Sequence, residues 1–187
     1  MKGRGAASGH LRLSGGEARG RKLACPKGIR PAESLVRLAV FNMLGSQIQG
    51  ALVVDLFAGS GAYGLEALSR GAGEAVFVDR SAAAAAAIRE NLARLGWGDR
   101  ATVAEADCRR WLASPARLEG VDLVFLDPPY NDPALAATLR LLDSLLATGA
   151  VVVAEHPAGL ELPILDRLRP WRERTYGGTA VTLLEVT

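Results

Sequence analysis

The sequence predicts an α/β protein: a doubly wound, largely parallel sheet of seven strands with a small N-terminal β-hairpin and helix. Three observations support this fold class. From about residue 50, apolar runs that suit buried strands alternate with stretches of helical periodicity, as in parallel sheets. A glycine turn follows the first of these runs. The last two runs are separated by Gly177-Gly178, which is typical of a hairpin.

The 187 residues suit one domain with a small extension at its N-terminus. Alternating residues in Leu11–Leu13 and Gly20–Ala24, on either side of Ser14-Gly15-Gly16, predict a short hairpin. Apolar residues at helical spacing predict a helix over Ala32–Leu44 that ends at Gly45. We expect three parts: a flexible basic tail at 1–10, a hairpin-helix extension at 11–48 and the main domain at 49–187.

Five apolar runs of the main domain predict its parallel strands: Ala51–Phe57, Glu74–Asp79, Ala101–Glu105, Val121–Asp127 and Ala150–Glu155. Helices are expected between them: from the glycine turn to about Arg70, then Ser81–Leu95, Arg109–Ala113 and Pro133–Ala147. Ser81 is a favourable N-cap, and the alanines after it are the strongest helix formers. Beyond the fifth strand we expect a short helix at 162–169 and a hairpin of Trp171–Tyr176 and Ala180–Val186.

Composition excludes several classes of protein. With 49% hydrophobic residues the chain can build a substantial core, yet no run approaches the roughly 18 apolar residues of a membrane span. No apolar segment follows the first basic residues, as a secretory signal requires. The two cysteines, Cys25 and Cys108, lie outside any metal-type spacing, and there are only two histidines. We therefore expect a cytoplasmic monomer with reduced thiols, no metal and no membrane contact.

The net charge of +2 conceals a strong asymmetry. Residues 1–30 contain eight Lys and Arg residues against one Glu, a net charge of +7, so the remainder carries −5. A basic arm on an acidic body predicts a polyanionic partner that the N-terminus contacts. The candidate contacts are Arg12, Arg19, Arg21, Lys22 and Arg30.

The glycine turn carries the strongest single signal. Gly59, Gly61 and Gly64 satisfy G-x-G-x-x-G directly after a strand and before a helix, the context that the motif requires. Glycines are needed there because side chains would hold a ligand away from the N–H groups of the helix N-terminus. Asp79 ends the next strand, where a carboxylate can accept both hydroxyls of a ribose. The pattern predicts an adenosine-type cofactor.

Two further acids bear on which cofactor this is. Asp55 precedes the glycines, where it would repel a pyrophosphate but could hold the ammonium of an amino-acid moiety, directly or through water. S-adenosylmethionine has that ammonium and no phosphate, whereas NAD has the pyrophosphate. Asp107 follows the third strand, where it could accept the adenine amino group or cap the short helix after it. These two roles of Asp107 are compatible.

The tetrapeptide Asp127-Pro128-Pro129-Tyr130 follows the fourth strand. Two prolines cannot donate to a strand ladder and fix their own φ, so they make a stiff turn. Alone, this turn would equally suit a surface loop with an exposed tyrosine. Because open α/β sheets bind ligands at the carboxyl ends of their strands, we expect it to face the cofactor residues.

Taken in order, Asp55, Gly59-x-Gly61, Asp79, Asp107 and the Pro-Pro-Tyr turn resemble the class I S-adenosylmethionine-dependent methyltransferases, and among them the enzymes that methylate amino groups. The wider pattern is similar to the bacterial family that methylates N2 of a guanine in 16S rRNA, over nearly the whole chain beyond the first ten or so residues. It comprises Gly15-Gly16, Arg19-Gly20-Arg21-Lys22-Leu23, Arg30-Pro31, Val36-Arg37, Phe41-Asn42 and the glycine turn. Ala32-Glu33-Ser34 departs from the family's Thr-x-Asp, so the polar contacts of that segment are not carried over.

The resemblance implies a role for each residue. Asp127 and the Pro128 carbonyl would accept the two amino hydrogens, Pro129 would stiffen the turn, and Tyr130 would stack on the base. The cofactor would be S-adenosylmethionine, leaving as S-adenosylhomocysteine, and the partner 16S rRNA, free or within an assembling 30S particle. The cofactor contacts would be Asp55, Phe57, Ala58, Gly59, Ser60, Gly61, Asp79, Arg80, Asp107, Cys108 and Asp127.

Three other functions remain open at this point. The acceptor could be another exocyclic amine, such as adenine N6 in RNA or DNA, or a protein amide. An NAD-dependent oxidoreductase would share the glycines but leave Asp127–Tyr130 and the basic arm without a role. A catalytically silent RNA-binding protein could keep the cofactor pocket. Tyr63 and His156 either line this pocket or are purely structural.

Overall fold

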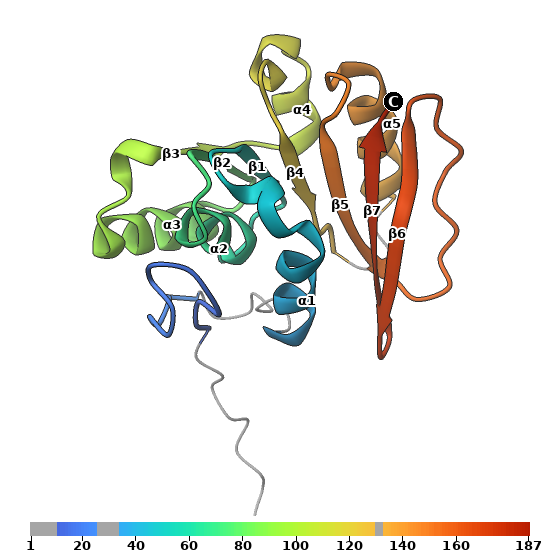
Figure 1. The fold of residues 1–187 in the computed structure, drawn as a ribbon. Helices are drawn as coiled ribbons and strands as arrows, with labels where there is room; N and C mark the ends of the chain where they lie inside the picture. The colour runs from blue at the N-terminus through green and yellow to red at the C-terminus, as the bar shows by residue number, and fades with distance from the viewer. Residues whose placement is uncertain (1–10, 26–33, 130–132) are drawn as a thin grey trace, which may run out of the picture.

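The computed structural model describes residues 11–25, 34–129 and 133–187, and they form one seven-stranded sheet with helices on both faces (Figure 1). The strands are β1 Leu52–Leu56, β2 Glu74–Asp79, β3 Ala101–Glu105, β4 Leu123–Leu126, β5 Val151–Pro157, β6 Leu168–Tyr176 and β7 Thr179–Val186. The α-helices are α1 Ser34–Leu44, α2 Ala62–Ser69, α3 Ala82–Leu95, α4 Cys108–Leu112 and α5 Ala134–Leu145. Three 3-10 helices are η1 Gly45–Ile48, η2 Gly98–Arg100 and η3 Pro115–Leu118. Among the helices of these residues, none has the length and apolar character to cross a membrane.

The strand order is β3-β2-β1-β4-β5-β7-β6. The first five strands are parallel, and β7 runs antiparallel to both β5 and β6. The predicted fold class, a doubly wound and largely parallel sheet of seven strands, is confirmed. Because β1 pairs with β2 on one side and β4 on the other, the carboxyl ends of these strands lie side by side at one edge.

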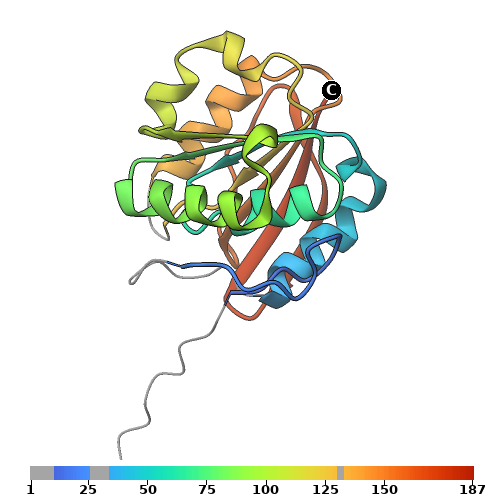
Figure 2. The same cartoon turned by 90° about the vertical axis from the view of Figure 1, so that its left-hand side faces the viewer.

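Two apolar clusters fill the space between the sheet and its helices. One includes Val53, Phe125 and Val153 from the sheet and lies under α1, α2 and α3. The other includes Val54 and Val152 and lies under α4 and α5. Figure 2 shows the two helix layers on opposite faces of the sheet. We call these faces the α1 face and the α5 face.

The segment at 162–169, predicted to form a short helix, is not helical, so that prediction is wrong. Instead, the carboxylate of Asp143 on α5 accepts backbone hydrogen bonds from Asp166, Arg167 and Leu168, at 3.0, 2.8 and 2.6 Å. A side chain from a distant helix thus occupies the N–H groups that the helix would have used. Strand β6 begins at Leu168, three residues before the predicted start.

The N-terminal hairpin is present only as a compact loop, residues 11–25, which we call the arm. It is closed by one isolated bridge between Arg12 and Lys22 rather than by two regular strands. Its apolar side chains are buried in the cluster of the α1 face: Leu11, Leu13, Ala18 and Leu23. Figure 1 shows the arm below α2 and α3 and beside α1. The arm is therefore packed into the core, while the predicted division at residues 10 and 48 stays a prediction.

A buried carboxylate joins the arm to the body. Glu66 on α2 is fully buried, and its oxygens accept hydrogen bonds from the Ser14 backbone N–H at 2.8 Å and from the Ser14 hydroxyl at 2.7 Å. It also pairs with Arg70 at 2.8 Å and with the fully buried Arg37 of α1 at 3.3 Å. Arg37 in turn donates to the backbone carbonyl of Arg12 at 2.6 Å. This network holds the arm, α1 and α2 in one arrangement.

We predict that Glu66→Ala destabilises the protein by about 3–5 kcal/mol, because it leaves the buried guanidinium of Arg37 without this carboxylate. The matched control is Glu90→Ala, which removes an exposed carboxylate paired with Arg94 and should cost less than about 1 kcal/mol. Urea unfolding followed by circular dichroism measures both. Equal losses in the two variants would show that the Glu66 network does not stabilise the fold.

Candidate active site

Four strand ends gather the predicted site residues at one edge of the sheet. The turn Gly59–Gly64 follows β1, Asp79 ends β2, Asp107 follows β3 and Asp127 follows β4. Because β1 lies between β2 and β4, the glycine turn is flanked by Asp79 on one side and Asp127 on the other. Open α/β sheets bind their ligands at such an edge.

The three glycines of the turn have different tasks. Gly59 and Gly61 adopt left-handed backbone, with φ of 53° and 74°, which other residues rarely do. A Cβ on Gly61 would lie 2.9 Å from the side chain of Ile88. A Cβ on Gly64 would lie only 2.3 Å from the ring of Phe77. Gly59 and Gly61 thus shape the turn, while Gly64 allows α2 to pack closely on β2.

Phe57, at the start of the turn, has a strained backbone and is held by a hydrogen bond to Cys108. Phe57 has a φ of 58°, which is uncommon for a bulky residue and occurs where surrounding structure enforces it. Its N–H donates to the Cys108 sulfur at 3.4 Å, and the thiol donates to the Val78 carbonyl at 3.8 Å. Burial, with smaller contributions from the neighbouring carboxylates, raises the pKa of Cys108 to about 12. Cys108 is therefore a neutral thiol that links β1, β2 and α4. Ala58 and Ser60 are buried in the same turn.

Asp79 connects the glycine turn to α3. Its Oδ2 accepts the Gly59 N–H and its Oδ1 accepts the Ser81 N–H, both at 2.8 Å. Arg80, the next residue, is exposed. Each oxygen of a carboxylate can accept a second hydrogen bond, so the geometry is compatible with ribose hydroxyls as additional donors. The ribose contact stays a prediction.

Asp107 caps α4. Its Oδ1 accepts the backbone N–H groups of Arg109 and Arg110, both at 3.1 Å. The N-cap role predicted for Asp107 is thus confirmed. The contact with an adenine amino group, which is compatible with the cap, stays a prediction.

Asp55 is buried beneath the turn, with 2% of its surface exposed, and its Oδ2 accepts the Gly64 N–H at 2.9 Å. Burial raises the pKa of Asp55 to about 8; the Gly64 hydrogen bond opposes this shift and the charge of Asp79 adds to it. The carboxyl group is therefore largely protonated below that pH. Its predicted contact with an ammonium group stays a prediction.

The proline turn continues directly from β4. Asp127 is half-buried, Pro128 is buried and Pro129 is exposed. Tyr130 lies outside the described residues, as does Arg30 of the predicted RNA contacts. Asp127 comes directly after β4, and its charge acts on Tyr63, whose ring stacks on Phe125 in the cluster of the α1 face, so we place Asp127 on that side of the sheet.

A buried pair beside Asp127 escaped the sequence reasoning. The Tyr63 hydroxyl donates to the Glu155 carboxylate at 2.7 Å, and both residues are buried. The Tyr63 ring stacks on Phe125, with 4.9 Å between centroids and an interplanar angle of 21°. Burial, then the charges of Glu155 and Asp127, raise the pKa of Tyr63. Glu155 is the last residue of the predicted fifth strand. Its position, as one more acid at the carboxyl edge of the sheet, is the feature of the sequence that could have pointed to this pair.

His156 lies next to this pair along β5 but points to the α5 face. Its Nε2 is 2.9 Å from the Thr182 hydroxyl and its Nδ1 is 3.0 Å from the Pro157 carbonyl. With 2% of its surface exposed, His156 makes structural contacts between β5 and β7.

The predicted RNA contacts of the arm all lie at the surface: Arg12, Arg19, Arg21 and Lys22. Arg12 donates to the Gly20 carbonyl at 2.8 Å, and Arg21 donates to the Arg94 carbonyl at 3.3 Å. The acid of the arm, Glu17, pairs with Arg100 at 3.2 Å. The arm therefore presents positive charge to solvent.

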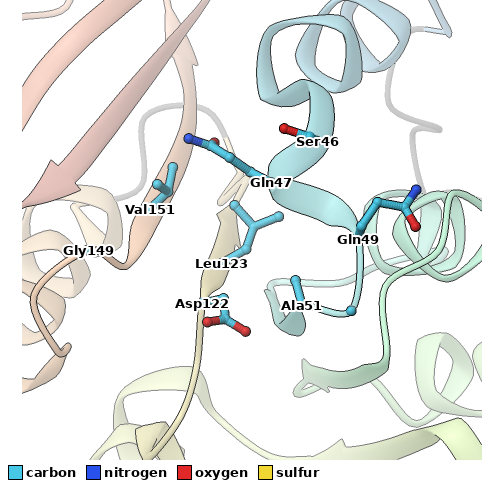
Figure 3. Close-up of a pocket in the computed structure, with 9 residues that line it drawn as sticks. Ser46, Gln47, Gln49, Ala51, Asp122, Leu123, Gly149 and Val151 are labelled. Carbon is cyan, nitrogen blue, oxygen red and sulfur yellow. The ribbon is translucent and has the colours of Figure 1, made fainter.

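A cavity of about 320 Å³ lies at the opposite edge of the sheet. Figure 3 shows it between η1 and the amino ends of β4 and β5. Its lining is Ser46, Gln47, Gln49, Gly50, Ala51, Asp122, Leu123, Gly149 and Val151. Asp122 accepts the Leu52 N–H there at 2.8 Å. None of the predicted site residues lines this cavity, so it is separate from the candidate active site.

The strand order, the reversed β7 and the glycine turn after β1 define the fold of the class I S-adenosylmethionine-dependent methyltransferases. The chain belongs to the family described as "Conserved hypothetical protein 95", whose model matches residues 11–185.

Several relatives support this assignment. The provisionally named rRNA methyltransferase YlbH of Bacillus subtilis is 39% identical over 179 residues, 92% of this chain and 97% of the relative. Ribosomal RNA small subunit methyltransferase D of Escherichia coli K12 is 37% identical over 185 residues, 95% of this chain and 91% of the relative. The solved structure of yhhF from Escherichia coli, provisionally named a methyltransferase, has a TM-score of 0.86 at 35% identity and covers 95% of this chain and 98% of its own. The resemblance to rRNA methyltransferases is thus confirmed.

A more distant neighbour carries a cofactor product. An RNA methyltransferase from Salinibacter ruber, solved in complex with S-adenosyl-L-homocysteine, has a TM-score of 0.66 at 19% identity. It covers 84% of this chain and 94% of its own. At that identity the similarity concerns the fold alone.

Proposed function

We propose that this protein transfers a methyl group from S-adenosylmethionine to the exocyclic N2 amine of a guanine in small-subunit ribosomal RNA. One observation carries the proposal. The glycine turn after β1 lies between the carboxyl ends of β2 and β4; Asp79 at the end of β2 binds the turn, and Asp127-Pro128 follow β4. A donor bound at the turn and an amine bound at Asp127 would then be neighbours. The names of the two relatives from Bacillus subtilis and Escherichia coli support rRNA as the acceptor. Guanine and N2 are what the resemblance of the wider sequence pattern to the 16S rRNA methyltransferase family implies.

The residues of the turn fit this cofactor. Gly59 and Gly61 adopt left-handed backbone and place no side chain in the loop that opens α2, while Asp55 accepts the Gly64 N–H in the first turn of this helix. Asp79 would accept the ribose hydroxyls, Asp107 the adenine amino group, and Asp55 the ammonium group. No phosphate-binding cation is needed for such a molecule. When bound, S-adenosylmethionine supplies a methyl group on a sulfonium sulfur, from which the neutral thioether S-adenosylhomocysteine is an excellent leaving group.

The protein's own task is then to position the amine. The lone pair of an exocyclic amine is delocalised into the base and is a weak nucleophile. Asp127 and the Pro128 carbonyl would accept its two hydrogens, which draws the nitrogen toward tetrahedral geometry and directs its lone pair outward. Tyr130 would stack on the base, worth about 1–3 kcal/mol. Orientation of this kind can supply a large part of a rate enhancement.

A guanine inside a duplex cannot reach this edge of the sheet, so the base must be unpaired or flipped out. The arm would hold phosphates nearby through Arg12, Arg19, Arg21 and Lys22, joined by Arg30. We further propose that the enzyme acts as a cytoplasmic monomer on 16S rRNA, either free or within an assembling 30S particle.

We predict that binding of S-adenosylhomocysteine releases a proton from Asp55. An ammonium beside Asp55 favours the charged carboxylate, whereas in the free protein its pKa is about 8. The affinity should therefore fall as the pH drops below 8, by up to about tenfold per pH unit. Asp55→Asn should abolish this dependence, and NAD should not bind. Calorimetry in two buffers of different ionisation enthalpy measures the released proton; equal release by Asp55→Asn would remove Asp55 from the cofactor site.

We predict that Asp127→Ala lowers the rate of methyl transfer by about 10²–10⁴-fold while the affinity for S-adenosylhomocysteine is largely kept, because Asp127 acts on the amine. The assay transfers labelled methyl groups to 16S RNA, free and in 30S particles, and identifies the product nucleoside by mass spectrometry.

The unaltered enzyme should produce N2-methylguanosine. Asp122→Ala is the matched control, because Asp122 is exposed near the opposite end of β4. A near-normal rate for Asp127→Ala would exclude Asp127 from the mechanism. If the product is N6-methyladenosine, the acceptor is adenine N6 and not guanine N2. If no RNA is methylated, the protein is a catalytically silent RNA-binding protein.

We predict that Arg19→Ala with Lys22→Ala weakens RNA binding and lowers the slope of log affinity against log salt by about 1.5, the value for two lost contacts with single-stranded phosphates. Deleting the arm would not test this role, since its apolar residues belong to the core. Filter binding at several salt concentrations measures the slope. Arg140→Ala on α5 serves as the control, and an unchanged slope in the arm variant would exclude these two side chains as phosphate contacts.

A further inference from the structure

The outermost strand, β6, presents two arginines on the α1 face. Seven consecutive residues of this strand, Arg169–Thr175, are exposed. Arg172 lies opposite Leu183, and Arg174 lies opposite Val181. Leu183 and Val181 belong to the core cluster of the α1 face. Because directly opposed residues of an antiparallel pair share a face, both arginines point to the side of the sheet that α1 covers.

The acid of β6 points the other way. Glu173 lies opposite Thr182 and accepts the hydrogen bond of its hydroxyl at 2.8 Å. Thr182 also contacts the buried His156, at 2.9 Å, on the α5 face. Glu173 therefore does not neutralise the two arginines. Helix α1 carries no acidic residue, and the ion pairs found within 11–25, 34–129 and 133–187 involve neither Arg172 nor Arg174.

The guanidinium of Arg172 is held in place beside α1. It lies 4.8 Å from the centre of the Trp171 ring and donates to the Met43 carbonyl at 3.4 Å. Arg174 donates to the carbonyl of Glu173 at 2.8 Å. A guanidinium has five N–H donors, so each of these arginines keeps donors for a further acceptor.

The register relates Arg174 to the candidate active site. Arg174 pairs with Val181, and Val181 pairs with Glu155. The last pair between β4 and β5 is Leu126 with Ala154. The next residues of the two strands, Asp127 and Glu155, therefore lie beside each other just beyond that pair. Three strand spacings thus separate Asp127 from Arg174, a distance of about 14 Å. At the rise of about 3.4 Å per nucleotide of a strand in a B-DNA duplex, that length corresponds to about four phosphates.

We propose that Arg172 and Arg174 form a second phosphate-binding strip for the RNA acceptor, across α1 from the arm. The proposal rests on RNA being the substrate. With the target base at Asp127, one side of the RNA reaches the arm and the other side crosses α1 to β6, and Figure 1 shows α1 between these two elements. The exposed residues of α1 that the RNA would cross are uncharged: Leu35, Leu38 and Asn42.

The test is the double variant Arg172→Ala with Arg174→Ala, measured for binding and methylation of 16S RNA. The slope of log affinity against log salt should fall by about 1.5, as expected for two lost phosphate contacts. The KM for RNA should rise roughly tenfold at physiological salt, while kcat and the affinity for S-adenosylhomocysteine stay unchanged. Arg172→Lys with Arg174→Lys keeps the charge and should restore most of the slope. Arg140→Ala, exposed on α5, is the control on the opposite face.

The outcomes separate this strip from the proposed function. An unchanged slope in the double variant overturns the strip, while methylation of RNA by the unaltered enzyme still supports the proposed function. Absence of methylation by the unaltered enzyme overturns both. Arginines on an edge strand can also serve only to prevent strand pairing between molecules. In that case the variant self-associates in sedimentation runs and its salt slope is unchanged. If the double variant does not fold, the single variant Arg174→Ala provides the test, and its slope of log affinity against log salt should fall by about 0.7.

Discussion

The placement of the arm relative to the carboxyl edge of the sheet depends on the interactions of the buried carboxylate of Glu66. Glu66 lies on α2, the helix that the glycine turn opens, and it holds Ser14 of the arm and Arg37 of α1. A buried carboxylate needs such partners, because it has lost its hydration. The arm, α1 and the glycine turn consequently form one unit. The basic side chains of the arm are then fixed in position relative to the strand ends, and the arm contributes both to the core and to the charged surface.

The acids at the carboxyl edge first satisfy the protein's own backbone. Asp79 accepts two N–H groups, Asp107 caps α4, and Asp55 accepts the N–H of Gly64. N–H groups at turns and helix starts have no partner within their own element, so the carboxylates stabilise the loops that form the edge. Asp79 and Asp107 are only partly buried, so further lone pairs of their carboxylates remain available to a ligand, whereas Asp55 is buried. The same residues would thus shape the site and bind in it, which explains why helix capping and cofactor binding predict the same positions.

Local patterns were enough to predict the strands, the glycine turn and the acids at the strand ends, since each depends on neighbouring residues. The failures all involve partners distant in the sequence. The stretch at 162–169 has the composition of a helix, but its backbone is bound by Asp143 from α5. A glutamate within a helix is usually solvated, so nothing local marked Glu66 as buried. The pairing of Tyr63 with Glu155 depends on how α2 packs against β5. Such contacts follow from the register of the sheet, which periodicity alone does not give.

The charged side chains of β6 are divided between the two faces of the sheet, and this bears on how an acceptor would approach. Asp127 follows β4 on the α1 face, where Tyr63 and Glu155 fill the space behind it. On that face the side chains of the arm and of β6 that reach solvent are largely arginine and lysine, while Glu66 is buried among cations. Glu173, by contrast, is bound on the α5 face, where Asp143 binds the backbone of the segment before β6. A polyanion is attracted to the face with unneutralised positive charge. Strand alternation within β6 directs Glu173 to the α5 face and Arg172 and Arg174 to the α1 face, so the proposed approach over α1 would meet the arginines of this strand and not its acid.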